Sequence, residues 1–87
     1  MNIEQITSRE TYLAFRSEWK AEYKELSEEI REGKGKIANA FRDGRDASGY
    51  QNSRRRNKAL ATRMLEMLKE AKEIAKAART AKLAEAA

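Results

Sequence analysis

The chain has 87 residues, of which 38% are charged and 40% hydrophobic, and it contains no proline, cysteine or histidine. This composition is typical of one small domain made of long helices with solvated faces, and it excludes disulfides, thiolate chemistry and histidine-based acid–base catalysis. Nineteen lysines and arginines against 14 acids give a formal net charge of +5 at pH 7.

The N-terminus lacks the basic and apolar parts of a secretory signal. No segment offers the roughly 20 consecutive apolar residues that a membrane span needs. We therefore expect an intracellular, cytoplasmic protein that contacts no membrane. Without a visible pocket or a set of catalytic side chains, we expect a binding protein rather than an enzyme.

A first helix is predicted after a short lead-in (residues 1–7). Thr7 and Glu10 stand three residues apart, which indicates a capping box at the start of a helix. Apolar residues then recur at intervals of three and four, as they do on one face of a helix. These residues are Tyr12, Phe15, Trp19, Tyr23, Leu26 and Ile30. The pattern predicts a helix over residues 8–32.

Glycines mark the middle of the chain, and we expect a jointed connector over residues 33–49. Gly33 and Gly35 each cost about 1 kcal/mol in a helix interior, so a hinge or a helix end is predicted there. Helical spacing resumes over residues 36–42, either as a short separate helix or as a continuation of the first. Residues 43–49 are the clearest loop.

A second helix is predicted over residues 50–83, followed by a frayed tail at residues 84–87. Ser48 and Gln51 match a second capping box just before it. Its apolar residues follow a heptad rhythm that suits packing along another helix. They are Leu60, Met64, Met67, Ala71, Ile74, Ala78 and Ala81.

The two apolar rows match best if the helices run antiparallel. Aromatic residues at the start of the first helix then meet alanines at the end of the second, so large side chains lie against small ones. The predicted fold is therefore all-α, a single-domain antiparallel helical hairpin over residues 1–87, which could dimerise into a bundle.

Charged residues flank both apolar rows. One flank of the first helix is acidic and the other is basic: Glu18, Glu22, Glu25 and Glu29 against Arg16, Lys20, Lys24 and Arg31. The second helix repeats this division with Glu66, Glu70 and Glu73 against Lys69, Lys72, Lys76 and Arg79. We expect one acidic and one basic edge instead of cross-helix ion pairs. Solvated helix faces are the simpler interpretation, and association of copies through these edges is the alternative.

The most basic segment spans residues 34–63, where nine of the 19 cations occur and Asp43 and Asp46 are the only acids. Three consecutive arginines near a helix start are not explained by helix stability, since the macrodipole favours acids there. Guanidinium groups bind phosphate and carboxylate bidentately. The candidate binding residues are Lys34, Lys36, Arg42, Arg45, Tyr50, Asn52, Arg54, Arg55, Arg56, Lys58 and Arg63.

Three hypotheses follow for this segment. In the first, the end of the hairpin binds the phosphates of RNA or DNA. In the second, the protein is a small inhibitor or adaptor, of the kind that viruses and mobile elements encode, and docks on an acidic surface of a larger protein or ribonucleoprotein assembly. In the third, it is a self-associating structural hairpin. We expect no cofactor and no metal, because the glutamates flank the apolar row and no histidine accompanies them.

Overall fold

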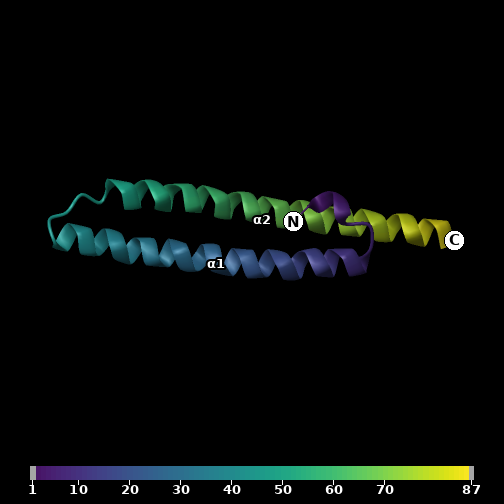
Figure 1. The fold of residues 1–87 in the computed structure, drawn as a ribbon. Coiled ribbons are helices and arrows are strands. Elements are labelled where there is room, and N and C mark those ends of the chain that lie inside the picture. Colours follow the sequence, from purple (N-terminus) through teal and green to yellow (C-terminus); the bar gives the residue numbers. More distant parts are fainter. Residues whose placement is uncertain (1, 87) are drawn as a thin grey trace.

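A computed structural model describes residues 2–86 and shows two long antiparallel helices preceded by one short helical turn (Figure 1). The turn η1 spans Ile3–Gln5, α1 spans Arg9–Arg42 and α2 spans Ser48–Ala86. The molecule is a rod with extents of 68 × 16 × 14 Å. The predicted all-α helical hairpin is confirmed.

Helix α1 is capped by Ser8, not by Thr7. The Ser8 Oγ accepts a hydrogen bond from the Thr11 backbone N–H at 3.3 Å. In return, the Thr11 Oγ1 accepts one from the Ser8 backbone N–H at 2.9 Å. The predicted box of Thr7 and Glu10 is therefore wrong by one residue, because a threonine does here what a glutamate or glutamine usually does at this position.

Helix α1 continues through Gly33 and Gly35 without a break, so the predicted hinge is wrong and residues 36–42 belong to the first helix. Beyond the glycines, Ala40 is fully buried and Ile37 is half-buried. Packing of these residues against the rest of the hairpin outweighs the low helix propensity of two glycines.

The helices are joined by a tight turn over residues 43–47. Gly44 has a φ of 67°, and the Arg45 backbone N–H donates to the Ala40 carbonyl at 2.8 Å. This is the arrangement of a Schellman motif, in which a left-handed residue, usually glycine, ends the helix. The turn is shorter than the predicted loop because α2 begins at Ser48.

The start of α2 depends on Asp46. Its carboxylate accepts hydrogen bonds from the backbone N–H and the hydroxyl of Ser48, both at 3.0 Å. These two bonds, the backbone one first, lower the pKa of Asp46 from its ordinary value of 3.8. The predicted capping box of Ser48 and Gln51 is therefore wrong, since Ser48 is the first residue of the helix. At the other end residues 84–86 are helical, and residue 87 lies outside the described residues.

The core lies between the helices in the half of the rod that holds the chain start. Ile6, Phe15, Trp19 and Ala71 are buried together. The ring of Tyr23 stacks on Trp19, with centroids 4.7 Å apart. The predicted match of aromatic residues in the first helix with alanines in the second is confirmed.

Helix α2 is rotated from its predicted orientation by roughly 60°, somewhat more than half of the 100° step between successive residues. Leu60 is 47% exposed and Ala81 is also exposed, so both lie outside the seam. The row of α2 residues centred on the seam is Arg54, Asn57, Ala61, Met64, Leu68, Ala71, Ala75 and Ala78. Met67 and Ile74 lie at its margin, in the cluster that includes Ile3 and Ile6. The lead-in segment thus supplies apolar residues that the sequence analysis assigned to no element.

Candidate binding surfaces

The eleven predicted binding residues lie in the part of the rod nearer the turn, which we call the basic loop end, and Arg63, next to the Met64 that Trp19 contacts, lies farthest from the turn. They come from the last turns of α1, the turn itself and the first turns of α2. Ten of them are exposed, and Arg54 is half-buried. The hairpin therefore brings Lys34 and Lys36 of α1 to the same end as the arginines of α2.

This end owes its charge to an acid-free stretch. Residues 47–65 contain five cations and no aspartate or glutamate. Arg45, in the turn, is bonded to Asp43 at 3.1 Å, which is the only ion pair within 4 Å in the part of the chain that the structure describes. An exposed pair of this kind contributes under about 1 kcal/mol. The cations of α2 at this end are thus free to meet an external anion.

Helical geometry divides the three consecutive arginines among different directions. Each residue turns by 100°, so when Arg54 lies on the seam, Arg55 and Arg56 fall on opposite outer flanks of α2. The Nε of Arg54 is buried and has no hydrogen-bond partner among the described residues. The position facing Arg54 is Gly33, where an added Cβ would stand 3.8 Å from the Arg54 Cβ. Arg54 therefore lies at the seam with its Nε buried, whereas Arg55 and Arg56 are exposed.

The flank of α2 that carries Arg56 borders a shallow groove. Glutamates and cations line this groove together: Glu29, Glu32, Lys36, Arg54 and Arg56. The mixture of signs makes it a weaker anion site than the outer face of α2. The exposed cations of α2 at this end are Arg55, Arg56, Lys58 and Arg63, of which Arg56 borders the groove.

A basic edge extends from the loop end along one side of the hairpin. It is formed by the residues that come immediately after each seam residue in the sequence. In an antiparallel pair these residues lie on the same side of both helices. None of the residues of α1 and α2 that follow the seam in this way is an acid. The cations among them are Arg16, Lys20, Lys24, Arg31, Lys34, Arg55, Lys58, Lys69, Lys72, Lys76 and Arg79.

The opposite edge is acidic mainly along α1. The rotation of α2 turns Glu66 and Glu73 away from α1, onto the outer face of the hairpin, and places Arg56 and Arg63 on this side instead. The acids that remain are Glu18, Glu22, Glu25, Glu29 and Glu32 of α1 and Glu70 of α2. The predicted acidic edge is therefore correct for the first helix and wrong for most of the second.

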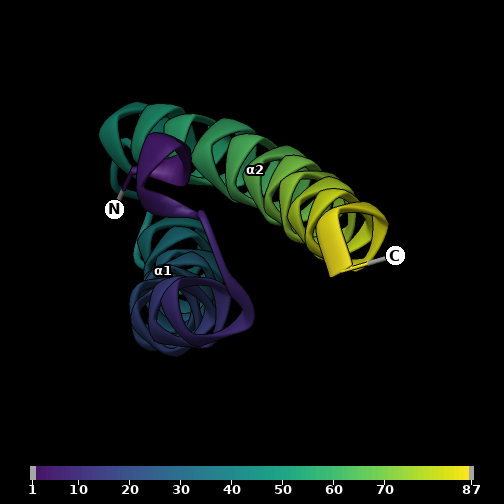
Figure 2. The same ribbon diagram turned by 90° about the vertical axis from the view of Figure 1, so that its right-hand side faces the viewer.

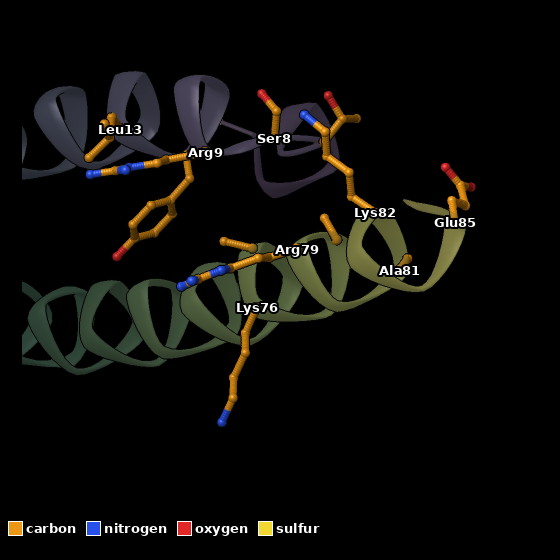
Figure 3. A pocket seen from close by; sticks show the side chains of 12 residues that line it. Ser8, Arg9, Leu13, Lys76, Arg79, Ala81, Lys82 and Glu85 are labelled. Atoms are coloured by element: carbon orange, nitrogen blue, oxygen red, sulfur yellow. The ribbon is translucent and has the colours of Figure 1, made fainter. Parts of the chain in front are cut away.

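A second groove, which the sequence analysis did not predict, lies at the open end of the hairpin (Figure 3). It separates the first turn of α1 from the last turns of α2 and has a volume of about 1220 Å³. The only feature of the sequence that indicated such a groove was the greater length of the second predicted helix, whose end extends beyond the start of the first. In the structure α2 has 39 residues and α1 has 34.

Other kinds of site find no support in residues 2–86. No group of three or more histidines, cysteines, aspartates and glutamates is placed to hold a metal ion within that range. Neither described helix contains a window apolar enough to cross a membrane.

No protein-family model, curated protein or solved structure matches this chain. We therefore base the proposed function on the charge and shape of the surfaces described above.

Proposed function

We propose that the protein binds the phosphate backbone of RNA or DNA through the basic loop end. The observation that supports this is the exposure of Arg55, Arg56, Lys58 and Arg63 within a stretch that has no acid. Cations without ion-pair partners lose no internal interaction when they meet phosphates, and binding releases the counterions condensed on the nucleic acid.

The spacing of these cations suits a phosphate backbone. Arg56 and Arg63 lie on the same side of α2 and are seven residues apart, which is about 10 Å along a helix. That length equals about three steps of about 3.4 Å along one strand of a duplex. Lys34 and Lys36 add cations from α1, while Tyr50, which is 38% exposed, could stack on an unpaired base.

The same arginines could instead bind carboxylates, since a guanidinium group matches both anions. In that alternative the protein is a cytoplasmic inhibitor or adaptor that docks on an acidic protein or ribonucleoprotein surface. A third alternative, self-association through the charged edges, has less support, because the acidic edge is interrupted along α2 by Arg56 and Arg63.

The test is fluorescence anisotropy with labelled single-stranded RNA, single-stranded DNA and duplex DNA at several salt concentrations. We expect R55A/R56A to weaken binding about tenfold or more. The slope of the logarithm of the binding constant against the logarithm of the salt concentration should fall in magnitude by about 2, one for each lost phosphate contact. The matched control is R79A/K82A, which removes the same charge at the opposite end of the rod. Equal losses in the two double variants, or no loss in R55A/R56A, would overturn the proposal.

Two further measurements separate the alternatives. Protein partners that stay bound after nuclease treatment, and are lost in R55A/R56A, would support the adaptor hypothesis. A molar mass above that of the monomer by light scattering at low salt, returning to the monomer at high salt, would support self-association.

A further inference from the structure

The open end of the hairpin holds a groove that no part of the described chain covers. Residues 7–13 form one wall and residues 75–85 of α2 form the other. Figure 2 shows that η1 folds over one side of the hairpin while the last turns of α2 curve away to the other side. The lead-in segment therefore leaves this groove open.

The floor of the groove is apolar. Tyr12 and Leu13 contribute from α1, and Ala75, Ala78 and Ala81 contribute from α2. Leu13 is 46% exposed although it borders the core residues of α1. Alanine side chains let a neighbouring helix approach at the short end of the usual interaxial range of about 8–10 Å. The floor thus resembles one half of a helix–helix contact.

The rim of the groove is basic. It carries Arg9, Arg79 and Lys82, with Glu85 as the one acid among the lining residues; the side chain of Lys76, which also lines the groove, extends from α2 away from α1. Figure 3 shows Arg9 and Arg79 extending along the two walls, while Lys82 reaches from α2 toward the start of α1. None of these four cations is within 4 Å of an acid in residues 2–86.

We propose that this groove docks an amphipathic α-helix of a partner protein, with an apolar stripe flanked by glutamates or aspartates. The apolar stripe would cover the alanines and Leu13, and the acidic flanks would meet the rim cations. This proposal does not depend on nucleic-acid binding at the basic loop end.

Two other occupants fit less well. A second copy that docked symmetrically would place the rim cations Arg9, Arg79 and Lys82 of one groove against those of the other, and like charges at an interface are unfavourable. A nucleic-acid backbone would match the rim but would leave the alanine floor without an apolar partner. The combination of floor and rim therefore favours an acidic helix.

The test uses the full chain and two labelled synthetic peptides of about 20 residues, long enough to form helix in water. The first peptide has leucines in a heptad pattern with glutamate flanks, and the second has lysine in place of every glutamate. We expect the glutamate peptide to bind, with affinity that falls as salt increases, and the lysine peptide not to bind. Equal binding of both peptides would overturn the proposal.

Variants then locate the site. We expect R79E/K82E to weaken binding of the glutamate peptide about tenfold or more, because two attractions become repulsions. The control R55E/R56E changes the charge equally at the loop end and should leave peptide affinity unchanged. A81W fills the floor at an exposed position and should abolish binding while circular dichroism shows the fold intact.

Competition decides between a helix and a nucleic acid in the groove. If duplex DNA displaces the glutamate peptide from the R55E/R56E variant, the groove is a nucleic-acid surface and the proposal is wrong. Binding of the peptide without such displacement supports it, whatever the outcome at the loop end.

Discussion

The indole Nε1–H of Trp19 donates a hydrogen bond to the backbone carbonyl of Met64 across a distance of 2.7 Å, and so joins the two helices directly. Trp19 is 7% exposed and is the only tryptophan in the chain. The bond sets the position of α1 along α2, because a shift of either helix would separate the donor from that carbonyl.

Replacement of this tryptophan should weaken the hairpin. We expect Trp19→Phe to lower the free energy of unfolding by about 1–2 kcal/mol, through the lost hydrogen bond and the reduced volume. Urea denaturation followed by circular dichroism measures the change. Tyr23→Phe, which removes a hydroxyl from the ring stacked on Trp19, is the control and should cost less; an equal cost would show that the indole bond contributes nothing.

Replacement by alanine should change the stability of the protein in opposite directions at Gly35 in α1 and at Gly44 in the turn. Gly35 has open space around it, so Gly35→Ala should stabilise the protein by about 1 kcal/mol through higher helix propensity. Gly44 has a positive φ, so Gly44→Ala should destabilise it by about 1 kcal/mol. Thermal melting of both variants checks the pair, and destabilisation by Gly35→Ala would show that the helix does break there.

The cap of α1 can be located by substitution. We expect Ser8→Ala to cost about 1 kcal/mol, because the Thr11 backbone N–H loses its acceptor. Thr7→Ala and Glu10→Ala should each change stability by less than about 0.5 kcal/mol. If Thr7→Ala lowers the free energy of unfolding more than Ser8→Ala does, Thr7 and not Ser8 is the capping residue.

The carboxylate of Asp46 should titrate below its ordinary pKa of 3.8. The folded state stabilises the ionised carboxylate of Asp46 through its two hydrogen bonds. This contribution to the free energy of unfolding is complete above the ordinary pKa and is lost as the pH falls through the lowered value. Ser48→Ala removes the hydroxyl donor but keeps the stronger backbone N–H, so the pKa should rise only part of the way. NMR titration of the carboxyl carbon measures both, and an unchanged pKa in Ser48→Ala would contradict the assigned hydrogen bond.

Two substitutions test the rotation of α2. Leu68 belongs only to the observed row and packs against the core, so Leu68→Ala should cost about 2 kcal/mol. Leu60→Ala should cost less than about 0.5 kcal/mol, because this side chain is largely solvated. A large cost at Leu60 would restore the orientation predicted from its heptad spacing.

Much of the fold followed from spacing along the chain. Aromatic and aliphatic residues at intervals of three and four predicted α1, and the alanines predicted which end of α2 would meet Trp19. The gathering of the eleven candidate residues at one end also followed from the hairpin, since a turn near Gly44 brings Lys34 and Arg55 to the same place. These features depend on the periodicity of apolar residues and on the position of the turn, and both can be read from the sequence alone.

The continuity of α1 through Gly33, the inward position of Arg54 and the groove beside Leu13 depended on contacts between distant segments. Ile6 covers the margin of α2, so the helix turns its alanines rather than Leu60 toward the aromatic residues of α1. That rotation decides which charges share an edge, and it follows from how large and small side chains fit together in three dimensions. No pattern within one helix contains that information, because the free energy that selects the orientation comes from both helices and the lead-in at once.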